Sequence, residues 1–352
     1  MPGEGTPLCM VEQRWDPTCG RPSGLVFPEY LDPTGENGPT RVQARSSRWE
    51  PLGRGWYVRA DRPECVEQRI LDAACRLPEG GAVTGWAALR WRGGGYFDGL
   101  APGGADPVPV PLLLGGGNFR PIPGCARSKA QLAPSEWHYV AGLPVTTVQR
   151  ALFDEVVRRN ELWASVEAVC MAAAARLISV ELFSESLFHR SAWTGVPLAR
   201  KATGLARNDC WSPPEVRMHL IWELVAEFPR ARANRPVFDL DGNLIGLPDL
   251  FDPESGTVGE YDGEHHRETD QRRSDVTREE RFRDLGLEYF SVIAGDSRGT
   301  VAARMRRTRA RAKFLSLESC AWTLDPPHWY RVPETLDAYL RRTGLAEQLT
   351  HR

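Results

Sequence analysis

The stretch LIGLPDLFDPESGTVGEYDGEHH, residues 244–266, decides how the last third of this chain is interpreted. Its apolar runs LIGLPDLF and TVGEYDG predict two strands, because turn-forming residues separate them. Alternate residues of a strand face the same way. Asp249 therefore lies on one face of the first predicted strand, and Glu260 and Asp262 lie together on one face of the second.

These three carboxylates predict a metal site. Facing side chains of neighbouring strands approach to about 4.5–5.5 Å, and carboxylates that close repel one another unless a cation neutralises them. Oxygen ligands suit Mg²⁺ or Mn²⁺, which can lower the pKa of an attacking water and offset charge in a transition state. For Asp262 an alternative stays open, since Asp262-Gly263 is also a pair that forms turns.

The elements around this stretch follow a definite order. SPPEVRMHLIWELVAEF, residues 212–228, carries an apolar stripe and is predicted to form one helix capped by Ser212. The strand PVFDL precedes the turn Asp241–Asn243, and SDVTREERFRDLG is a helix that stops at Gly286. LEYFSVIAG is a further strand and TVAARMRRTRARAKF a last helix. The predicted order is α-β-β-β-α-β-α.

This order and these motifs resemble the PD-(D/E)XK nucleases, within the branch related to very-short-patch repair endonucleases. Pro248-Asp249 matches the PD element, and Glu260-Tyr261-Asp262 occupies the (D/E)XK element, followed by His265 and His266. The resemblance implies a restriction-endonuclease-like αβββαβ core that hydrolyses DNA phosphodiester bonds with Mg²⁺ or Mn²⁺. It implies Asp249, Glu260 and Asp262 as metal ligands.

The chain departs from the superfamily at Asp262, which stands where the usual lysine would be. The assisting group in its place is expected to be Asp262 or His265, of which His265 lies just past Gly263 and has a near-neutral pKa that suits proton transfer. The resemblance also places Arg278 and Arg281, on the helix with Asp275, against phosphate. Glu215 has two interpretations: it completes a capping box with Ser212, or it reaches the metal as a first-helix glutamate.

A run of basic residues marks the last helix. Residues 298–313 hold seven Arg and Lys and no acid. Like charges three and four residues apart oppose helix formation, so a polyanion partner is one interpretation and a solvated face is the other. The helix face formed by Arg304, Arg307 and Arg311 is the predicted contact with nucleic acid.

The chain upstream resembles, more weakly, relatives of the abortive-infection AbiEi-type antitoxins. The resemblance rests on GRGWYV, VTGWAALRW and GLPVTTVQRALFDE. It implies a defence or toxin–antitoxin setting. The predicted organisation is α+β, in five segments: an irregular segment 1–48, a mixed α/β domain 49–154, a helical connector 155–210, the nuclease-like domain 211–314 and a tail 315–352.

Composition adds little beyond this organisation. The 352 residues carry a net charge of −2. The eight cysteines include no C-x-x-C pair, which predicts a reduced, cytoplasmic protein. The protein is also predicted not to span a membrane. Arginine greatly outnumbers lysine, through phosphate binding or through codon bias. DNA is the predicted partner, with a second copy of the chain or a defence-system component as further partners. The alternatives to a nuclease are an antitoxin-like DNA-binding regulator with a vestigial nuclease core and a nuclease-fold interaction module.

Overall fold

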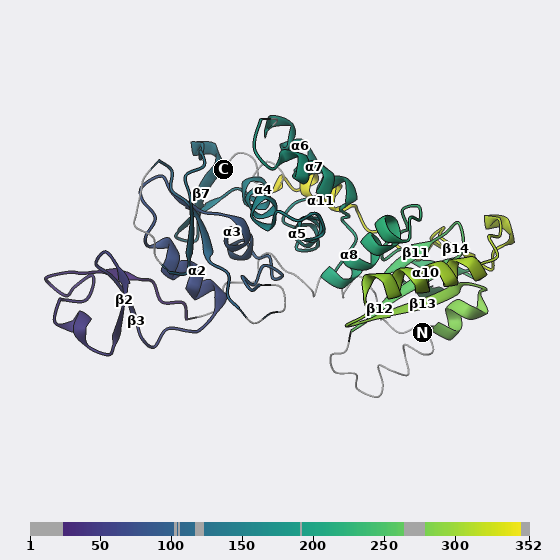
Figure 1. Ribbon diagram of the computed structural model, residues 1–352, viewed down its shortest axis with the longest axis horizontal. Helices are drawn as coiled ribbons and strands as arrows, with labels where there is room; N and C mark the ends of the chain where they lie inside the picture. The colour runs from purple at the N-terminus through teal and green to yellow at the C-terminus, as the bar shows by residue number, and fades with distance from the viewer. Residues whose placement is uncertain are drawn as a thin grey trace. The chain divides into compact units, whose positions relative to one another are not determined.

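The computed structural model describes residues 24–101, 104, 106–116, 123–190, 192–263 and 279–345. The chain divides into two units, which are described separately. Unit 1 comprises Met1–Thr203 and Leu336–Arg352, and unit 2 comprises Gly204–Thr335. Figure 1 shows helices beside small sheets in both units, so the chain is α+β as predicted.

Unit 1 begins with a three-stranded antiparallel sheet in the order β1-β3-β2. The β2–β3 turn is made by Arg54 and Gly55, both with positive φ (55° and 83°), the conformation that a tight hairpin turn needs. The stretch GRGWYV contains most of β3. The elements are β1 (Glu29–Tyr30), η1 (Gln43–Arg45), β2 (Trp49–Gly53) and β3 (Trp56–Arg59).

A five-stranded sheet in the order β6-β5-β4-β8-β7 forms the centre of unit 1. The strands are β4 (Ala82–Val83), β5 (Val110–Leu113), β6 (Cys125–Ser128), β7 (Trp137–Val140) and β8 (Leu143–Thr146). The helices are α2 (Val66–Ala74), α3 (Gly85–Trp91), η2 (Pro134–Glu136), α4 (Val148–Arg159), α5 (Leu162–Ala174), α6 (Val180–Ser186), η3 (Phe188–Arg190), α7 (Val196–Leu205) and α11 (Leu336–Arg342).

Side-chain hydrogen bonds fix two helices of this unit. Helix α4 begins directly after Thr147, whose side chain accepts a hydrogen bond from the backbone N–H of Arg150. The C-terminal helix α11 packs beside α6 through a hydrogen bond of 2.7 Å from Ser179 Oγ to Asp337 Oδ1.

Unit 2 contains two three-stranded sheets, β10-β9-β14 and β11-β12-β13. In the second sheet β12 pairs antiparallel with β11 and parallel with β13. Residues 279–284 are helical, and the predicted stop at Gly286 is confirmed by its φ of 76°. The other elements are α8 (Pro213–Leu220), η4 (Ile221–Val225), β9 (Val237–Asp239), β10 (Leu244–Gly246), β11 (Leu250–Asp252), β12 (Thr257–Asp262), β13 (Glu288–Ile293), α10 (Arg298–Arg311), η5 (Leu317–Ser319) and β14 (Trp322–Thr323).

Apolar side chains cover both faces of the sheet β11-β12-β13. On one face, Phe251 and Val258 pack with Phe282 and with Trp322 of the neighbouring sheet. On the other face, Phe290 stacks on Trp222 of η4 with ring centroids 6.2 Å apart. The ring of Phe290 also lies against Gly259, where a Cβ atom would meet it at 2.3 Å. A glycine therefore stands in this strand because an aromatic ring occupies the space of its side chain.

The predicted strand LIGLPDLF is wrong as a single element. The stretch forms two strands that belong to different sheets: β10 ends at Gly246, and β11 begins at Leu250. Pro248 explains the break, because it has no N–H to donate to a ladder and its carbonyl accepts from Asn234 N at 3.0 Å. Asp249 therefore lies just before a strand, and four strands instead of three separate α8 from the helix at residues 279–284.

The predicted helix over residues 212–228 also differs in part. It begins where predicted, with Ser212 accepting from Glu215 N, but after Leu220 it continues as a π-helical turn over Ile221–Val225. In this wider turn the N–H of Ala226 bonds to the carbonyl of Ile221 at 2.8 Å.

Candidate metal and nucleic-acid site

The register of β11 and β12 places Asp249 across from Glu260. Leu250 pairs with Gly259, so the preceding residue of one strand faces the following residue of the other. The Asp249 side chain reaches β12, where its Oδ2 accepts the N–H of Tyr261 at 2.8 Å. In a regular ladder the carbonyl of Pro248 would take this N–H, but that carbonyl is turned to Asn234. The carboxylate thus completes the end of the strand pair.

A hydrogen bond from His219 fixes the backbone of Asp249. Its Nε2 lies 2.8 Å from the carbonyl oxygen of Asp249, and the imidazole is only 2% exposed. Burial lowers the pKa of His219 well below its ordinary value, so the ring is neutral and Nε2–H donates. Its Nδ1 has no hydrogen-bond partner among the described residues. A neutral histidine on α8 therefore fixes the start of β11.

Glu260 is a buried carboxylate in the middle of this arrangement. Its side chain is on the face of β12 that also carries Val258, and the residue is 9% exposed. The hydroxyl of Tyr289 on β13 donates to Glu260 Oε2 at 3.3 Å. Glu260 is thus a buried carboxylate beside Asp249, with Tyr289 as one of its hydrogen-bond donors.

Asp262 stands at the end of the same strand and is half-buried. Within the described ranges, no three His, Cys, Asp or Glu side chains are grouped so that they could hold a metal ion. The adjacent carboxylates Asp249 and Glu260 are the part of the predicted cluster that the register supports. His265, His266, Asp275 and Arg278 lie outside the described residues.

Ser212 caps the helix as predicted, but the capping box is formed only in part, because the Glu215 carboxylate accepts the N–H of Trp211 and not that of Ser212. The backbone N–H of Glu215 is accepted by Ser212 Oγ, and the carboxylate receives Ser212 Oγ–H at 2.8 Å. Its Oε2 accepts from Trp211 N at 2.8 Å and from Asn234 Nδ2 at 2.9 Å. Three donors therefore satisfy this buried carboxylate without a metal, and its proposed role at a metal stays a prediction.

The three predicted nucleic-acid contacts on α10 line one groove. Arg304, Arg307 and Arg311 lie along a cavity of about 290 Å³ at the free edge of β13. Arg307 is exposed and forms no ion pair with another described residue. Arg281 is also exposed, on the helix at residues 279–284, but does not line this groove. The groove thus offers guanidinium groups suited to a phosphate backbone.

The expectation that the charges of α10 lack compensation is wrong. Acids from distant parts of the chain pair with its arginines, which removes the like-charge repulsion that the helix sequence alone suggests. Arg306 in turn donates to the carbonyl of Val225. The ion pairs are Arg304–Asp296 at 2.8 Å, Arg309–Asp252 at 2.9 Å, Arg309–Glu254 at 2.7 Å and Arg311–Glu288 at 3.1 Å.

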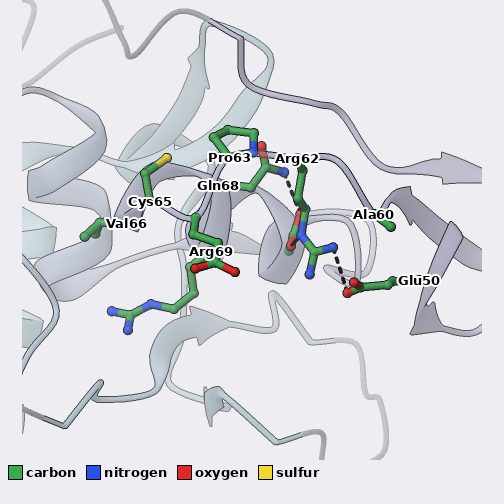
Figure 2. Close-up of a pocket in the computed structure, with 10 residues that line it drawn as sticks. Glu50, Ala60, Arg62, Pro63, Cys65, Val66, Gln68 and Arg69 are labelled. Carbon is green, nitrogen blue, oxygen red and sulfur yellow. Dashed lines mark hydrogen bonds and ion pairs between the residues drawn. The ribbon is translucent and has the colours of Figure 1, made fainter. Parts of the chain in front are cut away.

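Unit 1 contains a cavity of about 550 Å³ between the first sheet and α2, shown in Figure 2. Arg62 bridges Glu50 at 2.7 Å and Asp72 at 3.0 Å across it. Gln68 donates to the carbonyl of Val26 at 2.7 Å and accepts its N–H at 2.9 Å. These contacts of Arg62 and Gln68 hold the first sheet to α2.

His219 and Tyr289 were not predicted as site residues. Each contacts its partner across about thirty positions of sequence, so only the fold brings them together. The sole sequence signal was the position of His219 among the apolar residues of its helix.

Comparison of the chain with models of protein families, with curated proteins and with solved structures found no match. In the described part of the chain every helix is too short or too polar to cross a membrane.

Proposed function

We propose that unit 2 is a metal-dependent nuclease that hydrolyses DNA phosphodiester bonds. The observation that carries this proposal is the register of β11 and β12, which sets Asp249 opposite the buried carboxylate of Glu260. Two carboxylates from neighbouring strands fit Mg²⁺, which is commonly held by one or two carboxylates, with water and substrate phosphate as its other ligands. When bound there, such an ion would polarise the scissile phosphate and lower the pKa of a bound water.

Side chains of unit 2 would position the two carboxylates and supply positive charge for the phosphate backbone. Tyr289 orients the Glu260 carboxylate through its hydroxyl. His219 and the Tyr261 N–H hold both the backbone and the side chain of Asp249. The arginine groove along α10 is where the phosphate backbone would lie, with Arg307 as the group not engaged in an ion pair with a described residue. Asp262 and His265 remain the proposed assisting groups on the basis of the sequence.

Cleavage of supercoiled plasmid tests this proposal. The full chain is expected to nick the plasmid with Mg²⁺ or Mn²⁺ and to stop in EDTA. Glu260→Gln should lower the rate by about a hundredfold or more, the scale for losing a group that stabilises transition-state charge. Glu318→Gln is the matched control, because Glu318 is an exposed carboxylate on η5 of the same unit. Equal rates for both variants would exclude this carboxylate pair as the active site.

A second candidate is a DNA-binding regulator in which the nuclease core is vestigial. Two observations favour it: the Asp249 carboxylate already accepts a backbone N–H, and no group of three metal-ligating side chains occurs among the residues that the structure describes. The arginine groove needs no metal to hold DNA. Unchanged DNA affinity in EDTA, together with no cleavage in any metal, would select this candidate over the nuclease.

A further inference from the structure

A second cavity in unit 1, with a volume of about 460 Å³, has the features of a small-molecule site. Its wall is formed by β5, β6, α4 and the segment at Trp193, and it combines an apolar lining with a few polar groups. Ligand sites commonly have volumes of about 300–1,000 Å³ and this kind of lining. The apolar lining includes Leu112, Leu113, Phe153, Val157 and Trp193.

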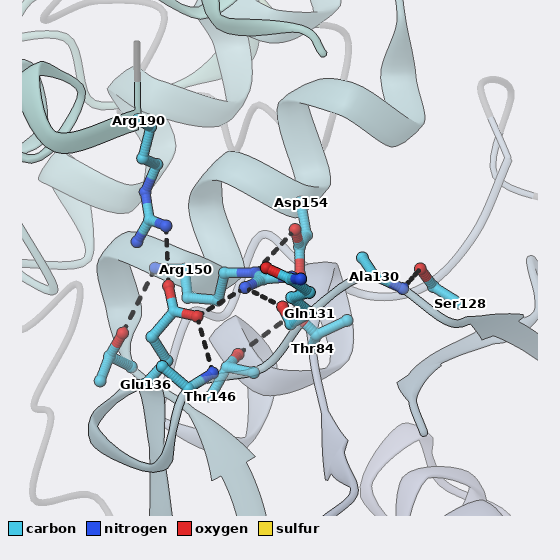
Figure 3. Close-up of polar contacts among 11 residues, drawn as sticks. Thr84, Ser128, Ala130, Gln131, Glu136, Thr146, Arg150, Asp154 and Arg190 are labelled. Carbon is cyan, nitrogen blue, oxygen red and sulfur yellow. Dashed lines mark hydrogen bonds and ion pairs between the residues drawn. The ribbon is translucent and has the colours of Figure 1, made fainter. Parts of the chain in front are cut away.

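Arg150 forms part of the cavity wall and is fully buried. Figure 3 shows its side chain among its polar partners Asp154, Glu136 and Gln131. Its Nε donates to Asp154 at 3.0 Å, and its Nη1 donates to Glu136 at 2.7 Å and to the carbonyl of Gln131 at 2.8 Å. The guanidinium also lies 4.7 Å from the ring centroid of Trp193. These contacts fix its plane within the wall.

One donor of this buried group is left over. Nη2 of Arg150 has no hydrogen-bond partner among the described residues. An unsatisfied donor of a buried cation is costly. Nη2 has almost no solvent-accessible surface, so it adds positive charge to the wall of the cavity and is not itself a contact point for a ligand.

The charges around the cavity favour an anionic acceptor. Arg150 pairs with Glu136 and with Asp154, and Arg190 pairs with the same Glu136. A second group joins two other arginines to one glutamate. The described lining itself holds three guanidinium groups, Arg127, Arg150 and Arg158, and one carboxylate, Asp154, a surplus of two positive charges. Burial raises the pKa of Asp154 above its ordinary value, against the opposing effect of Arg150. The second group consists of Arg158, Arg159 and Glu155.

We propose that this cavity binds a small organic anion, with its charged group at Arg158, close to the buried positive charge of Arg150, and its apolar body against Trp193. A polynucleotide is disfavoured because the wall strand β5 is buried throughout and the lining is largely apolar. A cation is disfavoured by the arginines. The site lies entirely within unit 1, so this inference does not depend on the nuclease activity of unit 2.

The test uses three probes that share one apolar body: 2-naphthoate, 2-naphthyl phosphate and the neutral 2-naphthamide. Isothermal titration of the full chain is expected to show that at least one anion binds about tenfold or more tightly than the amide, the scale of one charge-assisted hydrogen bond. The anion that binds more tightly identifies a carboxylate or a phosphate as the preferred group. Equal affinity for anion and amide, or no anion binding at millimolar concentration, would overturn the proposal.

Two neighbouring arginines provide a matched pair of variants. Arg158 and Arg159 both bond to Glu155 at 2.7 Å, but only Arg158 lines the cavity. Arg158→Gln should weaken anion binding about tenfold, whereas Arg159→Gln should leave it unchanged. The same loss in both variants would mean that the effect is structural and would refute the site. If Arg158→Gln fails to fold, Arg127→Gln at the exposed part of the lining takes its place.

Discussion

Replacing Asp249 with alanine should destabilise unit 2 by about 1.5–3 kcal/mol, the range for a hydrogen bond to a charged group. The Asp249 carboxylate accepts the Tyr261 N–H at 2.8 Å, and the carbonyl of Pro248 that would otherwise take this N–H is bonded to Asn234. Alanine therefore leaves the half-buried Tyr261 N–H without an acceptor. Urea unfolding in EDTA, monitored by tryptophan fluorescence, measures the change in the free energy of unfolding.

The control is Asp249→Asn, which keeps an acceptor oxygen at the same place. In EDTA this variant should lose about 1 kcal/mol or less, because a neutral hydrogen bond replaces a charge-assisted one and repulsion from Glu260 is relieved. If the asparagine variant is as unstable as the alanine variant, the hydrogen bond to Tyr261 is not what the side chain contributes. If neither variant is destabilised, the strand-end role assigned to Asp249 is refuted.

Three further predictions concern other described residues. Because His219 is buried and neutral, the free energy of unfolding should fall as the pH drops below 6.5, by up to about 1.4 kcal/mol per pH unit. The reason is that only the unfolded chain takes up the proton there. Urea titrations at pH 7.5 and 5.5 should show a smaller fall in His219→Gln than in the wild type. Gly259→Ala should cost about 1–3 kcal/mol through the clash with the fixed ring of Phe290, and unchanged stability in urea would contradict that packing. Arg307→Gln should reduce the slope of log DNA affinity against log salt by about 0.9, whereas Arg306→Gln, whose side chain is outside the groove, should keep the wild-type slope; fluorescence anisotropy at several salt concentrations decides.

The sequence predicted most of the local structure because local rules govern it. The apolar stripe located α8, whose cap lies at Ser212 as predicted, and α10 lies in the predicted last helix. Apolar runs located β9, β12 and β13. The error at LIGLPDLF arose because Pro248 was considered as part of a motif, while its missing N–H and its carbonyl bond to Asn234 were not.

The candidate site could be predicted only in part. The pairing of Asp249 with Glu260 follows from strand alternation once the register is known. The ion pairs of α10 could not be predicted, because Arg309 meets Asp252 from 57 positions away and Arg311 meets Glu288 from 23 positions away. The bond of Arg150 to Glu136 was missed for the same reason, since Glu136 belongs to η2, whereas Asp154 lies four residues away on the same helix α4.

Titration of Mn²⁺ into the full chain tests the central claim, that Asp249 and Glu260 form one metal site, most directly. Isothermal calorimetry should detect Mn²⁺ binding to the wild type and no binding to the double variant Asp249→Asn, Glu260→Gln. Both substitutions keep a hydrogen-bonding oxygen but remove the charge that attracts the ion. Binding should also raise the wild-type stability, by about 2.7 kcal/mol at a hundredfold excess over Kd. Equal Mn²⁺ affinity in the wild type and in a folded double variant would contradict the assignment.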